Sequence, residues 1–524
     1  EKRKRRHCCL LPTHPKISMS TINLSSLLCL LSLVVLFASN VHSRSLPSLA
    51  KQKSFRHPQA ANLGNGDTED FFHFWQLTDP HLDLQYLPGT VANCDDLPIC
   101  CRSNSSNSDP NQPKKLAGIY GPGQLGSSCD IPLKTWEETV QFIKGYFGDD
   151  VQKQNELFVF YGGDNLAHDD WEYTKSLNLK LMKLVHESML NILRPSSTAS
   201  TTTPVKAANN VNNKVNERHN SLLLSAIGNH DGYPVDQFDF HPANSWFLDP
   251  FTDLMMEKSG INDQGALETM RHSGYYTVKV REGLRAIILN TQWQDPFNFH
   301  LYKDRTGDPA NQLSFLSKVL SNARTNSERA IILGHIPPGM KDHSATPSSI
   351  SSYNLKFQQI VDEFSDVIIV QSYGHTHKDS FHVVMDYATN TVPKSIVLTT
   401  PSVSTWTTQN PAVRLFKLDN KYPYDLVDVV TFYSNVTRAH KDGKMSFEVE
   451  YSTKQAYNMP DLSPKSWYQL ANQFLTNDTL WSRFSDHYFA KFTKLSCEGK
   501  CRLAHYCATV YTQIKDYTNC IVHP

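Results

Sequence analysis

The chain has 524 residues, of which 40% are hydrophobic, 19% charged and 11% aromatic. This is the composition of a globular protein, and it excludes a collagen, a coiled coil and a fully disordered chain. Lys and Arg together number 51, as do Asp and Glu, so the formal charge is zero. Without a basic surplus, the sequence indicates no nucleic-acid-binding surface.

The N-terminal segment has the pattern of a secretory signal peptide. Residues 1–18 contain the basic run KRKRR, which alone is typical of a nuclear signal; we treat them as an upstream extension outside the expected fold. After Met19, residues 24–38 form an apolar, Leu-rich core, and a candidate cleavage triplet follows at 41–43. This core is shorter than a membrane span, so we expect residues 19–43 to be a signal peptide, with a signal anchor as the alternative. We expect no transmembrane segment in the mature chain.

A polar linker, residues 44–70, precedes a series of apolar runs that predict buried strands. Alternation of these strands with amphipathic helices predicts an α/β sandwich flanked by helices. Residues 195–215 are rich in Ser, Thr and Asn, so we expect a disordered insertion there. The predicted strands that end in polar residues are 71–79, 157–165, 221–231, 329–335 and 366–377; those without such ends are 275–280, 284–290 and 394–402; two of the predicted helices are 134–147 and 172–193.

The C-terminal part of the chain differs in pattern. The runs VDVVTFYSNVT and SFEVEYST indicate a hairpin, and helical patterns rich in aromatic residues follow. Ser463 followed by Pro464 is typical of a helix N-cap and first turn. We therefore expect one domain over 71–418 and a separate hairpin and helical domain over 419–524.

Cysteine usage agrees with export. Of 11 cysteines, three precede the expected cleavage point. The even number that is left predicts four disulfides; zinc knuckles are the alternative, but the sequence has no close Cys-x-x-Cys pair. Sequons for N-glycosylation have chemical meaning only on this export route. The eight cysteines are Cys94, Cys100, Cys101, Cys129, Cys497, Cys501, Cys507 and Cys520, and the sequons stand at Asn104, Asn435 and Asn477.

Polar residues with the chemistry of metal ligands follow five of the apolar runs. In chain order the motifs are TDPH, GGDN, GNHD, GH and GHTH. Side chains at the carboxyl ends of strands in an open α/β sheet converge on one crevice, and carboxylate, imidazole and amide groups together suit divalent metals. Each motif alone is most often a solvated turn, but the ordered set predicts a metal centre. The candidate ligands are Asp79, His81, Asp164, Asn229, His335, His375 and His377.

These motifs resemble those of the calcineurin-like metallophosphoesterases over about residues 71–418. The segments FWQLTDPHLD, GNHDGYPVDQF, GHTHKDSF and TTPSVSTWTTQNPAVRLF resemble, more narrowly, the acid sphingomyelinase-like phosphodiesterases. The cysteine-bearing tail is similar to the helical C-terminal domain of that family. Acid sphingomyelinase itself carries an N-terminal saposin domain with six cysteines, for which this chain has no room before Phe71. We therefore expect the branch without a saposin domain.

The resemblance implies a metallophosphoesterase β-sandwich, a disulfide-stapled helical C-terminal domain and two metal ions, which in this family are zinc. The ligand chemistry agrees with zinc but does not exclude manganese or iron. The implied ligands are Asp79, His81, Asp164 and His377 for one ion, and Asp164, Asn229, His335 and His375 for the other, with Asp164 bridging. The resemblance and the closure of short loops also suggest the disulfide pairs Cys94–Cys100, Cys101–Cys129, Cys497–Cys501 and Cys507–Cys520.

The resemblance further implies a phosphodiesterase in which a hydroxide bridging two metals attacks a phosphodiester or phosphoanhydride bond. His168 and His230 stand next to the ligand motifs without being needed as ligands, and they match positions that contact the phosphate in this family. We expect them to neutralise transition-state charge and to protonate the leaving group. A structural role is the alternative for each.

Several functions are compatible with these motifs. Purple acid phosphatases place an iron-binding Tyr three residues after the bridging Asp; here that residue is Ala167, which argues against a redox-iron phosphomonoesterase. We expect a nucleotide or a related soluble phosphodiester as substrate. Sphingomyelin and polyphosphate (the substrate of endopolyphosphatases) are alternatives, and a non-enzymatic glycoprotein is a third possibility. We expect a monomer that is secreted or lies in the lumen of a lysosome or vacuole.

Overall fold

Two six-stranded sheets lie at the centre of the computed structural model. The structure describes residues 71–146, 158–193, 222–342, 346–406 and 408–523, all within one compact unit. The expected upstream extension, signal peptide, polar linker and Ser/Thr/Asn-rich insertion lie outside the described residues. Within the described part of the chain, no helix is both long enough and apolar enough to cross a bilayer.

The first sheet has a parallel half and an antiparallel half. Strands β1, β2 and β3 run parallel to one another, and β10, β11 and β12 continue the sheet antiparallel from β1. The runs expected to form a hairpin are β11 and β12, which pair antiparallel with a short helix between them. In spatial order the strands are β12 (Phe447–Ser452), β11 (Leu426–Ser434), β10 (Ala412–Asp419), β1 (Phe71–Leu77), β2 (Phe158–Tyr161) and β3 (Leu222–Ser225).

The second sheet is parallel at its centre, with one antiparallel strand at each edge. All eight predicted strands are present in the two sheets. Sequence analysis predicted neither β8 nor β10. Ser380 and His382 interrupt the apolar pattern of β8, although all six of its residues are buried. In spatial order the strands are β4 (Tyr276–Arg281), β5 (Leu284–Ile288), β6 (Arg329–Leu333), β7 (Ile368–Tyr373), β9 (Pro393–Thr399) and β8 (Ser380–Met385).

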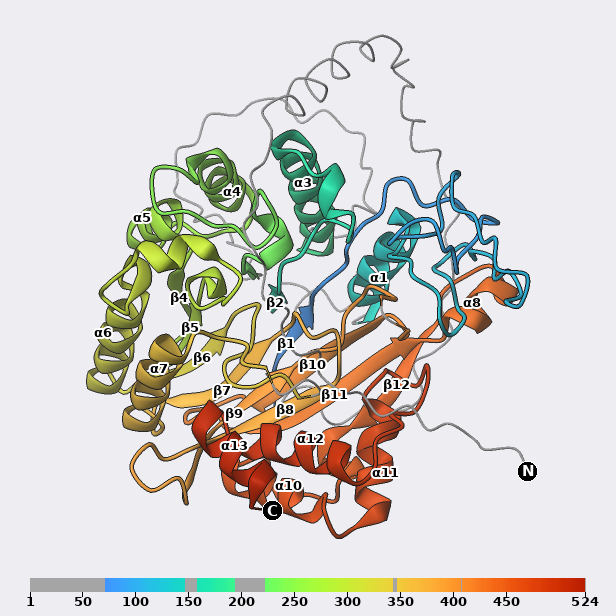
Figure 1. Cartoon of the computed structure of the whole chain (residues 1–524). Coiled ribbons are helices and arrows are strands. Elements are labelled where there is room, and N and C mark those ends of the chain that lie inside the picture. The colour runs from blue at the N-terminus through green and yellow to red at the C-terminus, as the bar shows by residue number, and fades with distance from the viewer. Residues whose placement is uncertain (1–70, 147–157, 194–221, 343–345, 407, 524) are drawn as a thin grey trace, which may run out of the picture. The chain divides into compact units, whose positions relative to one another are not determined.

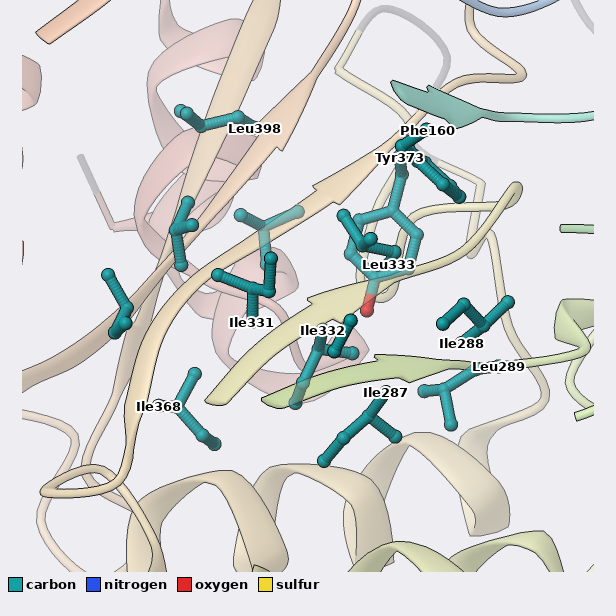
Figure 2. Close-up of a cluster of buried hydrophobic side chains, with 14 of the residues drawn as sticks. Phe160, Ile287, Ile288, Leu289, Ile331, Ile332, Leu333, Ile368, Tyr373 and Leu398 are labelled. Atoms are coloured by element: carbon teal, nitrogen blue, oxygen red, sulfur yellow. The ribbon is translucent and has the colours of Figure 1, made fainter. Parts of the chain in front are cut away.

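Both faces of the parallel half of the first sheet are covered, so its short strands are largely apolar. Trp75 and Val159 pack with α1 (Leu133–Tyr146) and α3 (Lys175–Leu193) in one buried cluster. The alternate residues Phe74 and Phe160 belong to a larger cluster that includes the second sheet. Figure 2 shows part of this cluster, in which isoleucine and leucine side chains of β5 and β6 gather near Tyr373 of β7. Alternate side chains of each strand point to opposite faces of the first sheet. One face packs on the second sheet and the other on the helices α1 and α3, which gives a sandwich with an outer helical layer.

Several of the remaining helices cover the second sheet, whereas α9 contacts β11 and β12 of the first sheet and α4 packs against α3 and α5 (Figure 1). Helix α6 contacts β6 and α7 contacts β8 and β9, whereas α10 and α12 pack against β9 and β8. The predicted N-cap is confirmed, because the Ser463 side chain accepts a hydrogen bond from the Ser466 amide and Pro464 begins α10. The helices are α4 (Ser245–Lys258), α5 (Gln264–Ser273), α6 (Gln312–Thr325), α7 (Ser351–Glu363), α8 (Val436–Asp442), α9 (Thr453–Ala456), α10 (Pro464–Gln473), α11 (Asp478–His487), α12 (Lys500–Val510) and α13 (Ile514–Val522).

A buried polar contact joins the two sheets beside the motif loops. The Gln76 side chain of β1 donates to the Tyr373 carbonyl of β7 at 3.1 Å, and the Ser372 hydroxyl donates to the Gln76 carbonyl oxygen. All three residues are almost fully buried. A buried amide is costly unless it is satisfied, so this contact sets the register of the two sheets at the ends of β1 and β7. The loops that follow these strands consequently face each other.

Candidate metal centre

The five motif loops meet at the joint between the two sheets. The parallel strands β1, β2 and β3 end at one edge of the first sheet, and β6 and β7 end together in the second. The sequence predicted convergence on the crevice of one open sheet; the structure differs, because three loops come from one sheet and two from the other. The packing of the sandwich, rather than neighbouring positions in a single sheet, brings the candidate ligands together.

Asp79, His81 and His377 form the first ligand group. The Nε2 atoms of His81 and His377 lie 3.1 Å apart. Asp79 Oδ1 lies 3.5 Å from His377 Nε2 and 3.9 Å from His81 Nε2. Donors about 2 Å from one zinc ion in a tetrahedral arrangement are separated by roughly 3.3–3.5 Å. The three buried side chains therefore have the spacing of ligands to a single ion.

Asp164, Asn229, His335 and His375 form the second ligand group. Asn229 Oδ1 lies 2.9 Å from both His335 Nε2 and His375 Nδ1, and Asp164 Oδ2 lies 3.1 Å from His335 Nε2. The same Asp164 oxygen is 3.4 Å from His81 Nε2 of the first group. Asp164 thus lies within reach of both groups, whose donor atoms are spaced as candidate ligands for two metal ions.

The backbone of this centre is held in a costly conformation. A non-glycine residue with positive φ is uncommon and is strained by roughly 1–3 kcal/mol, and such residues cluster at functional sites. Asn229 and His335 do not share this conformation. The five other candidate ligands have positive φ: Asp79 at 52°, His81 at 42°, Asp164 at 65°, His375 at 67° and His377 at 62°.

Glycines at the loop junctions allow the carboxylates to approach the neighbouring backbone. A Cβ atom on Gly228 would stand 2.0 Å from Asp164 Oδ1, and one on Gly374 would stand 2.4 Å from Asp79 Oδ2. Neither carboxylate could move away without leaving its ligand group. The glycines of GNHD and GHTH are therefore required, because a side chain at either position would collide with the carboxylate of a candidate ligand.

Backbone carbonyls orient three of the four candidate histidine ligands. The Nδ1 atoms of His81, His335 and His377 lie 2.6–2.7 Å from the carbonyl oxygens of Leu166, Gly162 and Trp406, respectively. A carbonyl only accepts hydrogen bonds, so each Nδ1 carries the proton and donates it. Each Nε2 then presents its lone pair to the centre, which is how metal-binding histidines are commonly oriented. The donor set fits divalent metal ions.

Electrostatics also favour positive charge at this centre. Burial alone would lower the pKa of His81, but the hydrogen bond and charge of Asp164 outweigh it and raise that pKa to about 9. For His335 burial is likewise outweighed, by the charges of Asp164 and Asp79, and its pKa is raised to about 10. The buried carboxylates of Asp79 and Asp164 stabilise the protonated form of these histidines. The same negative charge attracts a divalent cation.

Buried groups around Asp164 hold the GGDN and GNHD loops in place. The Asp231 carboxylate, itself buried, accepts hydrogen bonds from the backbone amides of Asp164 at 3.0 Å, Asn165 at 3.0 Å and Gly228 at 2.8 Å. The backbone amide of His230 donates to Asp164 Oδ1 at 2.9 Å. The GGDN and GNHD loops are therefore tied to each other, and Asp164 has little freedom to rotate.

His168 and His230 stand beside the first ligand group, as the sequence predicted from their positions. The His168 ring stacks on His81 with ring centres 4.0 Å apart, and the His230 ring lies edge-on to His81 at 4.8 Å. Burial, together with positive charge on neighbouring histidines, lowers the pKa of both well below its ordinary value. One ring nitrogen of each of these three histidines lies within 4.8 Å of the others, so the rings converge on one point.

Sequence reasoning missed three residues that contact these histidines. Asp130 Oδ1 and Oδ2 each lie 3.0 Å from His168 Nδ1, the Tyr173 hydroxyl lies 2.8 Å from His230 Nδ1, and Trp406 stacks on His168. None belongs to a metal-ligand motif. Asp130 follows Cys129 in an irregular segment and Tyr173 follows a short 3₁₀ helix, so no local pattern identified them. Trp406 lies in the run TTPSVSTWTTQNPAVRLF, which resembles the family but was assigned no role at the site.

The C-terminal part of the chain supports the GHTH loop. Asp379, two residues after His377, forms a buried ion pair with Arg414 and accepts a hydrogen bond from the Tyr451 hydroxyl at 2.8 Å. The Asp379 amide donates to the Tyr488 carbonyl at 3.2 Å. Residues of β10, β12 and the segment after α11 thus hold the strand that leaves the metal centre.

The described residues contain four disulfides, and none of them lies among the candidate ligands. The pairs are those that the family resemblance implies, and two of them staple the C-terminal helices. Asn104 is exposed, whereas Asn435 and Asn477 are half-buried and each accepts a capping hydrogen bond at the start of a helix. The four pairs are Cys94–Cys100, Cys101–Cys129, Cys497–Cys501 and Cys507–Cys520.

Comparison with known proteins gives a consistent group of relatives. The family model described as "Acid sphingomyelin phosphodiesterase C-terminal region" matches residues 388–524. Sphingomyelin phosphodiesterase B of Dictyostelium discoideum is 30% identical, over 92% of this chain and 69% of its own length. Cyclic GMP-AMP phosphodiesterase SMPDL3A of Bos taurus is 31% identical, over 85% of this chain and 90% of its own length.

A solved structure, that of a dimetal phosphatase from Danio rerio, matches with a TM-score of 0.38 and 12% identity. The match covers 73% of this chain and all of that protein.

Proposed function

We propose that this chain, which belongs to the acid sphingomyelinase-like phosphodiesterase family, hydrolyses a soluble phosphodiester with two divalent metal ions. It is a phosphoric diester hydrolase, as its relatives are phosphodiesterases. The observation that carries the metal-dependent mechanism is the position of Asp164, whose Oδ2 lies 3.4 Å from His81 Nε2 and 3.1 Å from His335 Nε2. A carboxylate between two ligand groups is suited to bridge two ions.

The two ions that we propose are Zn²⁺. Imidazole nitrogens and carboxylate oxygens form a common ligand set for zinc. Bound ions of this kind act as Lewis acids that polarise a phosphoryl oxygen and make a water molecule more acidic. Asp79, His81, Asp164 and His377 would hold one ion, and Asp164, Asn229, His335 and His375 the other.

His168 and His230 act on the substrate rather than on the metals. Both ligand groups are complete without them, and their rings converge beside the first group. A phosphodiester anion bound there brings the negative charge that favours their protonated forms. They are therefore suited to hold the phosphoryl oxygens and to give a proton to the leaving oxygen when the P–O bond breaks.

The proposed substrate class is a nucleotide or related soluble phosphodiester, as in the cyclic GMP-AMP phosphodiesterase SMPDL3A. The second candidate is sphingomyelin. It is favoured by the two sphingomyelin phosphodiesterases of Dictyostelium discoideum, which match 91% and 92% of this chain.

A substrate panel tests the proposal. The protein is assayed with bis(4-nitrophenyl) phosphate, cyclic GMP-AMP, ATP, polyphosphate and sphingomyelin in detergent micelles, and metal content is measured in the same preparation. We expect about two zinc ions per chain and hydrolysis of the first two substrates, abolished by a chelator and restored by Zn²⁺. Hydrolysis of sphingomyelin alone would replace the substrate class with the second candidate. Activity that survives complete removal of metal would contradict the mechanism.

We also propose that the protein works outside the cytosol, either secreted or in an acidic lumen, as a monomer with sugars on Asn104, Asn435 and Asn477. The support is the four disulfides, which persist in oxidising compartments. Expression in a eukaryotic cell should deliver the protein to the medium or to lysosomes, with a mobility shift on glycosidase treatment. Accumulation of unglycosylated protein in the cytosol would contradict this location.

A further inference from the structure

Arg102 is a buried cation that links two segments beside the metal centre. Its exposed fraction is 6%, and it follows Cys101, which a disulfide joins to Cys129. The Arg102 Nε donates to Asp83 Oδ2 at 3.0 Å, and Nη2 donates to Asp83 Oδ1 at 3.1 Å. The same Nη2 donates to Asp169 Oδ2 at 2.7 Å. One guanidinium group is thus shared by two buried carboxylates, and it binds one of them in the bidentate geometry that favours Arg.

The first of these segments is also held by its backbone. Asp83 follows the candidate ligand His81 by two residues. The Leu82 amide donates to the Asn165 carbonyl at 2.9 Å, and the Asp83 amide donates to the Ile131 carbonyl at 3.0 Å. Neither bond involves the guanidinium group, so we expect the loop that carries His81 to keep its place when that group is removed.

The second segment depends more on the guanidinium group. Asp169 follows His168 directly and precedes a short 3₁₀ helix, Asp170–Glu172. Among the described side chains, Arg102 is the one that donates to the Asp169 carboxylate. Trp171, two residues further on, is 54% exposed, so solvent lies close by. Without its partner, the carboxylate regains hydration by turning toward this solvent, which would draw the neighbouring backbone outward.

This second segment, residues 168–173, carries the groups that face the substrate in the proposed function. His168 is its first residue, and two of its side chains reach His230 Nδ1: the Tyr173 hydroxyl at 2.8 Å and Asp170 Oδ1 at 3.4 Å. The rings of His168 and His230 lie 4.8 Å apart beside the first ligand group. An outward shift of the segment would therefore change the position of both histidines relative to the metal ligands.

The same segment has another anchor at its start. The His168 amide donates to Asp130 Oδ2 at 2.7 Å, and Asp130 follows Cys129. The disulfide to Cys101 therefore holds both anchors, Asp130 and Arg102, at the two ends of one cross-link. Because one anchor stays, loss of the other should shift the segment rather than release it. A misplacement of about 1 Å is enough to slow a reaction by about 10²-fold.

We propose that Arg102 is a positioning residue for the hydrolysis, which through Asp169 keeps His168 and His230 in place against the phosphoryl group. This proposal rests on the proposed function, in which the two histidines hold phosphoryl oxygens. Donors of this kind act on the charge of the transition state through their position. A shift of the segment should therefore lower kcat more than it changes KM.

The test measures kcat, KM and metal content together in the Arg102→Ala variant. On bis(4-nitrophenyl) phosphate, kcat should fall by roughly 10–10²-fold and KM should change by less than about 3-fold. The metal content should stay at the wild-type value, since every candidate ligand remains. Arg285→Ala is the matched control, because it removes a partly buried pair with Glu328 at 2.9 Å in the second sheet. It should lower the unfolding temperature and leave kcat unchanged.

Two further measurements separate positioning from a merely structural ion pair. Guanidinium chloride, far below the concentration that unfolds the protein, should raise kcat of Arg102→Ala several-fold, since the free ion can bind between the two carboxylates. Sodium chloride at the same concentration should not. Arg102→Lys keeps the charge but not the fork of donors, so its kcat should stay below that of the wild-type protein. A wild-type rate in Arg102→Lys, or an unchanged kcat in Arg102→Ala, would overturn the proposal.

Asp169→Ala keeps the proposal testable if Arg102→Ala does not fold. It leaves Arg102 paired with Asp83, so it creates no unpaired buried charge. It should lower kcat by a factor similar to that of Arg102→Ala, and the double variant should be no slower than Arg102→Ala alone. A wild-type kcat in Asp169→Ala, or additive losses in the double variant, would contradict a path through Asp169. A wild-type protein that cleaves no phosphodiester would instead refute the proposed function, whereas failure of the present proposal shows only in the variants.

Discussion

The metal-ligand loops and the C-terminal part of the chain contribute to the same site in different ways. Each ligand loop follows a buried strand directly, so its residues are placed by the element just before them. The region from β12 to α13 contributes none of the seven candidate ligands. It contacts the loop that follows β7 through Tyr451 and the Tyr488 carbonyl. The difference shows that residues which bind and residues which hold the binding loop in place can be far apart in the chain.

The two regions also differ in how their buried charges are compensated. The ligand loops bury carboxylates beside histidines, an arrangement that attracts cations. The buried charges that the C-terminal region contains or contacts are paired: Glu450 with His487 inside the region, and Asp379 with Arg414 beside Tyr451. Substitutions in the first region should therefore remove metal and activity, whereas those in the second should remove stability first.

The largest effect is expected at the bridging ligand. Asp164→Asn should lose both ions and lower the hydrolysis rate by roughly 10⁴-fold or more, because metal ions supply several kcal/mol of transition-state stabilisation. Metal analysis and rates on bis(4-nitrophenyl) phosphate check this in one preparation. Asp366→Asn, at an exposed carboxylate paired with Arg324, is the control and should keep both. Retention of two ions by the Asp164 variant would argue against a bridge.

In the buried Arg414–Asp379 pair, Arg414→Ala should lower the free energy of unfolding by about 3–5 kcal/mol, since it leaves the Asp379 carboxylate buried without its counter-ion. Urea unfolding followed by fluorescence measures the change. Arg271→Ala removes an exposed pair with Asp253 and should cost less than about 1 kcal/mol. Equal losses in the two variants would mean that the Asp379 network does not carry the stability assigned to it.

Glu450 should make stability depend on pH. Burial raises its pKa from 4.5 to about 7, against the hydrogen bond from His487 that lowers it. Because the folded pKa is above the unfolded one, the stabilisation is complete below pH 4.5 and is lost as pH rises through 7. At about 1.4 kcal/mol per pKa unit, the wild-type protein should lose about 3 kcal/mol relative to Glu450→Gln between pH 4.5 and 8.

Chemical unfolding of both proteins at several pH values checks this dependence. Glu448→Gln, at an exposed neighbouring position on the same strand, is the control and should follow the wild-type curve. If Glu450→Gln follows the same curve as the wild-type protein, the pH dependence comes from other groups.

The smallest expected effect is the difference in stability loss between two disulfide variants. Cys101–Cys129 closes a loop of 28 residues in the motif-bearing region, and Cys497–Cys501 closes one of 4 residues in the C-terminal tail. On loop entropy alone, replacing each pair by alanines should cost about 3.6 and about 1.9 kcal/mol, respectively. Calorimetry of the two double variants measures the difference. A larger loss for the short loop would show that local packing, rather than entropy of the unfolded chain, sets their contribution.

The sequence allowed all five candidate ligand loops to be identified, because each motif combines an apolar strand with polar residues immediately after it. Asp79, Asp164 and the GHTH histidines are of this kind. Asp231 belongs to the GNHD motif, but its contacts with Asn165 and Gly228 form only where two loops meet in the fold. Its role in positioning Asp164 could therefore not be predicted from the sequence.

Asp130 and Tyr173 could not be predicted for a similar reason. Each lies outside any motif, and its partner histidine is held close to it by the folded chain rather than by sequence spacing. The strands β8 and β10 were also missed. In β8, which is buried on both faces, Ser380 and His382 interrupt the continuous apolar run that would identify such a strand.

The sequence by itself determined ten of the twelve described strands, the ligand types and the candidate residues that carry them, since strand periodicity and residues at strand ends are local properties. Only the tertiary structure decided that two sheets, not one, supply the ligands, and that Asp164 lies between the two groups. It also decided which buried carboxylate holds which histidine. These are contacts between segments as far apart as Gln76 and Ser372, and such contacts form because both sheets must bury their inner faces against each other.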